Sequence, residues 1–199
     1  SDKLTGTLSG KWLNGAIAKN LKSTIDLIFR KTKTVFENYS QYEFDDPASN
    51  FNSETMRIFD GSIDENGSAL IDYKIPGDIN APGMLNAVFT TRIFEQGGDA
   101  SISQKNWKYA PYSVFTGINL PGLKGKSRML FTDAVNEIKI VTVDEYGKPV
   151  RSEVEITVYK ISYRWWWESD DENLGYYVSN DRYKPVLTKT ITTTNGEGS

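Results

Sequence analysis

Residues 152–163 alternate apolar and polar side chains and lead, after Arg164, into three consecutive tryptophans, Trp165–Trp167. A period of two is typical of a β-strand with one face in a core and the other in solvent. Val154, Ile156 and Val158 share one of these faces. Three bulky rings in a row leave neither face polar, so at least one indole must point away from the domain's own core. The pattern therefore predicts a strand that ends at a second packing surface, formed by a partner domain or a ligand.

Most of the remaining chain also reads as strands separated by turns. The sequences Asp64-Glu65-Asn66-Gly67 and Gln96-Gly97-Gly98-Asp99 each separate two alternating runs, which predicts two β-hairpins. Residues 144–148 form a further turn, and only residues 16–21 allow a short helix. The sequence therefore predicts an all-β fold built as two immunoglobulin- or fibronectin-like β-sandwiches in tandem.

A junction between the two sandwiches is predicted near residues 106–112. Pro111 has no amide hydrogen and cannot sit inside a central strand. The apolar positions of the alternating runs predict a core for each half. For the first half these positions are Leu13, Ile25, Leu27, Phe29, Ile58, Leu70, Val88 and Phe94, and for the second they are Ile138, Ile140, Val154, Ile156 and Val158.

The chain of 199 residues contains no cysteine and no histidine. This excludes thiol nucleophiles, disulfides, zinc sites with Cys or His ligands, and every Ser-His or Cys-His catalytic arrangement. A formal net charge of −3, with Lys and Arg spread evenly, offers no basic face for nucleic acid. No apolar run approaches the roughly 18 residues that a membrane-spanning helix needs. The start at Ser1, without Met or signal peptide, and the linker-like tail at 194–199 lead us to expect a fragment of a longer chain.

Several turn motifs follow one another in a particular order along the chain. They are Trp12-Leu13-Asn14-Gly15-Ala16, Tyr42 to Pro47, Gly61 to Ala69, Phe94 to Ser101, Tyr109-Ala110-Pro111-Tyr112 with Gly117, and Val141 to Val150, followed by the tryptophan run. Each motif alone is common turn chemistry. Their order and spacing over residues 4–190 resemble the macroglobulin domains of bacterial alpha-2-macroglobulins, in a Bacteroidetes-like form.

The resemblance implies a fold and a role. The fold would be two macroglobulin β-sandwiches, at residues 1–108 and 109–199, the second near or carrying the bait segment. The family consists of large protease traps of the cell envelope, periplasmic or lipid-anchored, whose domains collapse around a protease that cuts the bait. The fragment would then be a structural, non-catalytic segment without cofactor, and its partners would be neighbouring domains of the parent chain and the target proteases. A thioester cannot lie in this segment, because that motif needs a cysteine.

Two groups of residues are candidate sites. The interface residues are predicted to be Trp165, Trp166, Trp167, Trp107 and Tyr109, which would pack against a neighbouring domain. The alternative is a surface adhesin or carbohydrate-binding module that stacks sugar rings on the tryptophan run. The polar segment 169–183 is either a protease-exposed loop, at Asp170, Asp171, Glu172 and Arg182, or an ordinary hairpin loop.

Two further patterns carry less weight. Ser62, Asp64 and Asn66 alternate as calcium ligands do, but Tyr73 stands where the pattern requires Glu, so a hairpin explains them better. Acidic pairs such as Asp45-Asp46 lie in turn-rich sequence, where adjacent carboxylates usually face solvent rather than each other across a glycosidase site. We therefore predict neither a metal nor a catalytic residue.

Overall fold

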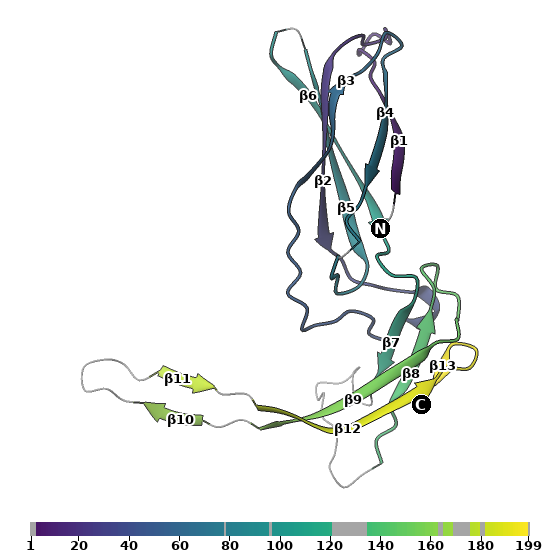
Figure 1. The fold of residues 1–199 in the computed structure, drawn as a ribbon, viewed down its shortest axis with the longest axis vertical. Coiled ribbons are helices and arrows are strands. Elements are labelled where there is room, and N and C mark those ends of the chain that lie inside the picture. The colour runs from purple at the N-terminus through teal and green to yellow at the C-terminus, as the bar shows by residue number, and fades with distance from the viewer. Residues whose placement is uncertain are drawn as a thin grey trace. The chain divides into compact units, whose positions relative to one another are not determined.

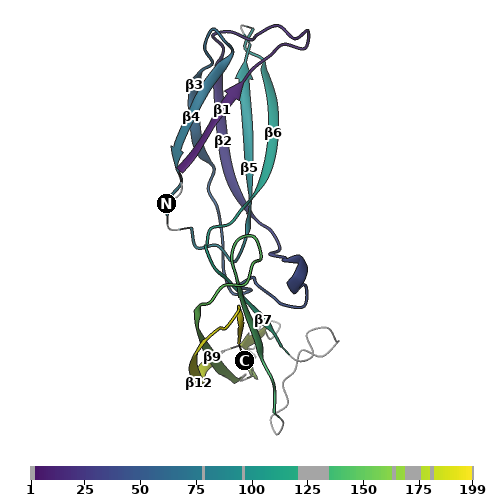
Figure 2. The ribbon, with the colours of Figure 1, turned by 90° about the vertical axis from the view of Figure 1, so that its right-hand side faces the viewer.

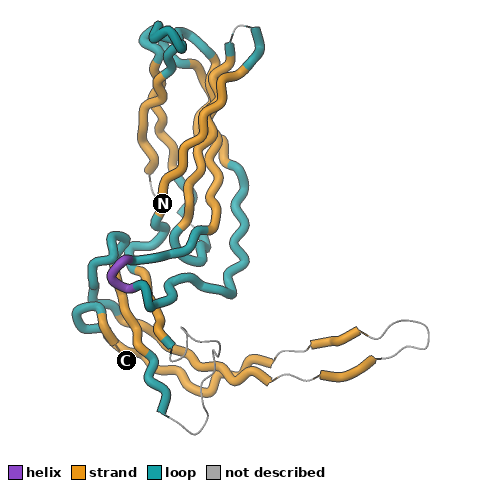
Figure 3. Tube along the Cα trace, turned by 180° about the vertical axis from the view of Figure 1, so that it is seen from behind, coloured by secondary structure: helices purple, strands orange, loops and turns teal. Residues whose placement is uncertain are grey.

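The computed structural model describes residues 3–77, 79–95, 97–120, 135–162, 165–168, 176–179 and 182–198. Within these ranges the chain is β-strand and loop, apart from one short 3-10 helix, η1, at Glu37–Tyr39 (Figure 3). The prediction of an all-β fold is confirmed. The helix allowed at residues 16–21 is absent, and Asn20 there adopts a φ of 56° that a right-handed helix excludes. Among the described residues, no helix has the length and apolar character to cross a membrane.

The contacts divide the chain into two compact units, Ser1–Phe115 and Thr116–Ser199. The first unit is a sandwich of a small and a large antiparallel sheet (Figure 1). The small sheet pairs β1 with β4, and the large sheet has the order β3-β2-β5-β6. The strand bounds are β1 Lys3–Ser9, β2 Lys22–Lys31, β3 Met56–Ser62, β4 Ser68–Lys74, β5 Leu85–Phe94 and β6 Ala100–Tyr109. Figure 2 shows β6 beside the area that β1 and β4 cover.

Of the two predicted hairpins, one is confirmed and one is corrected. β5 and β6 pair from Leu85↔Tyr109 to Phe94↔Ala100, and at the end of the hairpin the amide of Glu95 donates a hydrogen bond to the carbonyl of Asp99 at 2.8 Å. The turn at 64–67 also forms, but the strands on either side of it do not pair. β3 joins the large sheet and β4 joins the small one, so this turn carries the chain from one sheet to the other.

The core of the first unit lies between the two sheets. Ile25, Leu27 and Phe29 point inward from β2 and are almost fully buried. They pack with residues of neighbouring strands, namely Ile58, Ile75, Ala81, Leu85 and Ala87. This alternation confirms the face predicted for β2, and Val88 is buried as well.

The prediction of core residues is wrong at two positions, Leu13 and Leu70. Leu13 is fully exposed, because β1 ends at Ser9 and Leu13 lies in the turn that follows. Leu70 is 81% exposed. It pairs with Thr7 in the small sheet, while its neighbour Ile71 packs against the core. Period two identified β4 as a strand but assigned the wrong face to the interior.

The second unit contains a three-stranded sheet in the order β13-β8-β7. Its centre, β8, supplies the fully buried Val141 and Val143 and the buried Ile140, which was predicted. The predicted Ile138, Val154, Ile156 and Val158 are half-buried. The strand bounds are β7 Phe115–Asn119, β8 Lys139–Val143, β9 Glu153–Ser162, β10 Trp165–Glu168, β11 Tyr176–Ser179, β12 Arg182–Thr192 and β13 Glu197–Gly198.

The remaining strands of the second unit form two antiparallel pairs, β9 with β12 and β10 with β11. Ser162, at the end of β9, pairs with Arg182, at the start of β12. Trp165 of β10, three residues after Ser162, pairs with Ser179 of β11, three residues before Arg182. The two pairs therefore share one register. The register shifts once, at the bulge between Pro185 and Leu187.

Candidate interaction site

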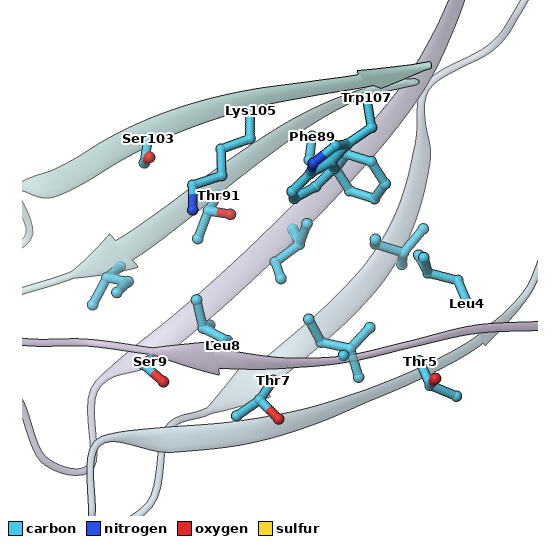
Figure 4. A pocket seen from close by; sticks show the side chains of 15 residues that line it. Leu4, Thr5, Thr7, Leu8, Ser9, Phe89, Thr91, Ser103, Lys105 and Trp107 are labelled. Atoms are coloured by element: carbon cyan, nitrogen blue, oxygen red, sulfur yellow. The ribbon is translucent and has the colours of Figure 1, made fainter. Parts of the chain in front are cut away.

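A groove opens in the first unit where the small sheet stops short of the large one. The small sheet has two strands and the large sheet four, so β1 and β4 cannot cover the whole inner face of the large sheet. The part of the large sheet that stays uncovered is formed by β5 and β6. The groove has a volume of about 600 Å³, and side chains from both sheets point into it (Figure 4).

One wall of the groove is β1. All residues from Leu4 to Ser9 line it, because the edge of the strand lies along the opening. Leu4, Gly6 and Leu8 share the inward face, and both leucines pack on the core. A Cβ atom placed on Gly6 would meet no atom within 4 Å. The middle of this wall therefore borders open space.

The opposite wall consists of alternate residues of β5 and β6. The rings of Phe89 and Trp107 meet edge to face, with centroids 4.9 Å apart and planes at 71°. Trp107 remains 55% exposed. Lys105 pairs with Phe89 across the strands, so it lines the same wall, and Figure 4 shows its side chain beside Thr91. This wall therefore has two aromatic rings at one end, with the hydroxyl groups of Thr91 and Ser103 and the cation of Lys105 beside them.

The structure places the predicted interface residues of the first unit on one face of β6. Trp107 and Tyr109 are two residues apart and point to the same side of the sheet. Their surroundings differ. The ring of Tyr109 lies 4.8 Å from that of Phe29 and packs against the core, whereas Trp107 borders the groove.

The other predicted site residues lie at the limit of the described chain. The backbones of Trp165, Trp166 and Trp167 form β10 and pair with Ser179, Val178 and Tyr177. Their side chains lie outside the described part, as do Asp170, Asp171 and Glu172. Arg182 is the first residue of β12. The predictions for the tryptophan run and for the exposed loop therefore stay predictions.

On the opposite face of the large sheet is an ion cluster that the sequence did not suggest. The carboxylate of Asp26, on β2, accepts hydrogen bonds from Arg57 of β3 and Arg92 of β5. Burial is the largest influence on the pKa of Asp26 and raises it. The hydrogen bonds and positive charges of the two arginines together outweigh burial, so the pKa of Asp26 lies below its usual value. The cluster ties three strands of the large sheet together.

The described residues contain no group of three or more His, Cys, Asp or Glu that could hold a metal ion. In the calcium-like sequence around Asp64, the carboxylate oxygen Oδ1 accepts hydrogen bonds from the backbone amides of Asn66 and Ser68, both at 2.8 Å. That arrangement is an Asx-type turn.

Two models of known protein families match this chain, one in each of the two compact units. Residues 1–108 match the family model of the bacterial alpha-2-macroglobulin MG5 domain, and residues 117–199 match that of bacterial macroglobulin domain 6. A comparison with curated proteins finds no match.

Similar solved structures are also alpha-2-macroglobulins. Salmonella alpha-2-macroglobulin reacted with methylamine is 15% identical, with a TM-score of 0.61, over 96% of this chain and 13% of that one. Escherichia coli alpha-2-macroglobulin is 18% identical in its native conformation, with a TM-score of 0.57, over 96% of this chain and 13% of that one. The form activated by porcine elastase gives the same identity, TM-score and share of this chain, over 18% of that chain.

At these identities the likeness to the solved structures is one of fold. This chain spans 13% of the length of the Salmonella protein and of the native Escherichia coli protein. The two family models match successive parts of the chain, at residues 1–108 and 117–199. The chain therefore belongs to the bacterial alpha-2-macroglobulin family and consists of macroglobulin domains.

Proposed function

We propose that this chain is a structural, non-catalytic segment of a bacterial alpha-2-macroglobulin-type protease inhibitor, with domains at residues 1–108 and 109–199. The observation that carries the proposal is the match to two macroglobulin models one after the other. The absence of Cys and His from the sequence agrees with a scaffold role, since neither a thioester nor a Cys-His or Ser-His site can be built from these residues.

In this role the segment would hold neighbouring domains of the parent in place, and the parent would take proteases as its targets. The Escherichia coli relative has been captured after activation by porcine elastase and by trypsin. Those two enzymes are therefore suitable probes for the parent of this chain. We place the parent in the cell envelope, in the periplasm or anchored by lipid, which fractionation of the producing cells would test.

The decisive experiment compares the full-length parent with the 199-residue chain. Each is mixed with elastase or trypsin, and residual protease activity is measured on a small chromogenic peptide and on a large protein substrate. A trap leaves cleavage of the small peptide intact and blocks cleavage of the large substrate. We expect this behaviour from the parent and no inhibition from the 199-residue chain. Stoichiometric inhibition by the isolated chain, or equal loss of both activities with the parent, would contradict the proposal.

The segment 169–183 remains our candidate for a protease-exposed loop, with an ordinary hairpin loop as the alternative. Limited digestion of the parent by trypsin, followed by mass analysis of the fragments, separates the two. A first cut at Arg182 supports exposure. If the first cuts all fall elsewhere, the segment is ordinary connecting chain.

A further inference from the structure

A second pocket of the first unit, with a volume of about 510 Å³, lies between two loops. One wall is residues 50–54, which lead into β3, and the other contains Pro76, Ile79 and Asn80, from the chain between β4 and β5. This pocket shares no lining residue with the groove beside β1. Its volume is within the range of about 300–1,000 Å³ that is typical of small-molecule sites.

The floor of the pocket is apolar. Phe29 of β2 is almost fully buried, whereas Phe51, Met56 and Ile79 pack on the core and stay half-buried. The half-buried side chains leave apolar surface open to the pocket. Contact with C–H groups of a ligand would remove this surface from water and favour binding.

The rim of the pocket has polar side chains on both sides. Asn50 and Asn52 stand on one wall and Asn80 on the other, and all three are exposed. Their carboxamides form no hydrogen bond within the described part of the chain. Each carboxamide has two N–H donors and an oxygen that accepts. The rim therefore offers unused donors and acceptors from two directions.

Hydrogen bonds hold the first wall in place. The hydroxyl of Ser53 accepts the amide of Phe29 at 3.1 Å and donates to the carbonyl of Glu54 at 3.2 Å. Just before this wall, the ammonium group of Lys31 donates to the carbonyl of Ser49 at 2.8 Å. The segment that carries Asn50 and Asn52 is thus fixed to β2 near both of its ends.

The second wall is fixed by a tight turn. The amide of Ala81 donates to the carbonyl of Ile79 at 2.9 Å, which places Asn80 at the centre of a three-residue turn. The hydroxyl of Tyr112 donates to the carbonyl of Ala81 at 2.7 Å. Because both walls are held by their own hydrogen bonds, a ligand would find the carboxamides already positioned and would lose little free energy in ordering them.

The charge of the pocket limits the class of ligand. Among the described residues that line it, Glu54 is the only charged one. A phosphate or a carboxylic acid would meet this negative charge and no compensating cation, so anionic ligands are disfavoured. The carboxamides and the carboxylate can all bond hydroxyl groups. A neutral ligand with many hydroxyls and an apolar face therefore fits both the rim and the floor.

We propose that this pocket binds a neutral saccharide. The hydroxyls on the rim of a pyranose ring would bond the carboxamides of Asn50, Asn52 and Asn80 and the carboxylate of Glu54, and the C–H groups on one ring face would cover the apolar floor. An extended peptide suits the pocket less, since bound peptides usually pair with a strand edge, whereas these hydrogen-bonding groups are side chains of two loops. The inference does not use the proposal that the parent traps proteases.

Nuclear magnetic resonance of the isotope-labelled 199-residue chain tests the proposal. The probes are the methyl glycosides of glucose, galactose, mannose and N-acetylglucosamine, each titrated separately. We expect at least one of them to shift the side-chain amide signals of Asn50, Asn52 and Asn80 in a saturable way. The Kd should be of the order of millimolar, as expected for so small a ligand. The signals of Asn106, exposed on β6, should stay unchanged.

Variants locate the ligand. Asn52→Ala and Asn80→Ala should each weaken binding about tenfold, because each removes a carboxamide that bonds two hydroxyls. Asn106→Ala, the matched control, should not change the Kd. Glu54→Gln keeps a group that bonds hydroxyls, so a neutral saccharide should lose about threefold or less in affinity. Unchanged signals outside the pocket show that each variant keeps its fold.

Four results would overturn the proposal. The first is that no glycoside shifts the pocket signals. The second is an equal loss of affinity in Asn52→Ala and Asn106→Ala. The third is near-complete loss of binding in Glu54→Gln, which would identify a cation site. The fourth is that the blocked peptide acetyl-Val-Thr-Val-amide shifts the pocket signals and the glycosides do not. Protease inhibition by the parent affects none of these results.

Discussion

The carboxylate oxygen Oδ1 of Asp64 accepts a hydrogen bond from the backbone amide of Ser68 at 2.8 Å. In the second unit, Oδ1 of Asp144 accepts one from the amide of Lys148, also at 2.8 Å. A glycine completes each turn, with a φ of 72° at Gly67 and 80° at Gly147. Both units therefore use the same Asp-x-x-Gly turn, and in both it lies between strands that belong to different sheets.

The position of Gly67 should tolerate no side chain, whereas Gly15 should tolerate one at moderate cost. Both residues have a positive φ, so alanine at either position costs about 1–2 kcal/mol of stability. At Gly67 a Cβ atom would also lie 2.8 Å from the carbonyl oxygens of Gly10 and Ala18, whereas at Gly15 it would meet nothing within 4 Å. Urea denaturation should show a clearly larger loss for Gly67→Ala than for Gly15→Ala. Equal losses would show that the turn relaxes to admit the methyl group.

Such turns could be predicted from the sequence because their chemistry is local. An Asp, a Gly three residues later and alternating runs on either side determine the hydrogen bonds within five residues. Which sheet each flanking strand joins depends on packing across the sandwich, and this is where the prediction failed. The hairpin expected at 64–67 is a crossing between sheets, and the face assigned to Leu70 was wrong for the same reason.

The candidate site was accessible from the sequence only in part. The sequence places Trp107, a large aromatic residue, near the predicted junction. The groove that it borders is formed with Phe89 of the next strand and with β1 of the other sheet. Gly6, where the wall opens, reads in sequence only as a weak strand position. No local pattern in the sequence shows that a two-stranded sheet leaves part of a four-stranded sheet uncovered.

Truncation of the core should distinguish Leu27 from Leu13, two leucines that the sequence had both assigned to the interior. Leu27 has no exposed area, and Leu13 is fully exposed. Leu27→Ala removes buried methyl groups and leaves a cavity, so the free energy of unfolding should fall by about 2–5 kcal/mol. Leu13→Ala should change it by less than about 0.5 kcal/mol. Denaturant midpoints at constant m-value measure both, and a large effect of Leu13→Ala would contradict the exposure seen here.

The ion cluster on the large sheet should make stability depend on pH in the acid range. Because Arg57 and Arg92 lower the pKa of Asp26 in the folded state, its ionised form stabilises the fold above the unfolded-state pKa of about 3.9. This contribution is lost as the pH falls through the lower folded-state pKa. Asp26→Asn should therefore lower stability by about 1–3 kcal/mol at neutral pH and by progressively less towards pH 2.

The control for this prediction is Asp72→Asn. Asp72 pairs with Lys3 in an exposed ion pair, with side chains 65% and 64% exposed, and such pairs contribute little. Its substitution should shift the unfolding midpoint only slightly at every pH. A constant loss for Asp26→Asn from pH 7 to pH 2 would show that packing, not charge, is the role of Asp26.

The last prediction concerns the second unit and the independence of the two domains. The hydroxyls of Thr142 and Thr193 are fully buried and lie 2.7 Å apart, and the Thr193 oxygen also accepts the amide of Ser152 at 2.9 Å. Thr193→Val keeps the shape of the side chain but leaves that amide without its partner, at a cost of about 1–3 kcal/mol. Thr188→Val, at an exposed position of β12, serves as the matched control. If residues 1–108 and 109–199 fold as separate domains, amide exchange in β8 should accelerate in the Thr193 variant while exchange in β2 stays unchanged. Equal acceleration in β2 and β8 would mean that the chain unfolds as one cooperative body, and the proposed division into domains would then have no thermodynamic basis.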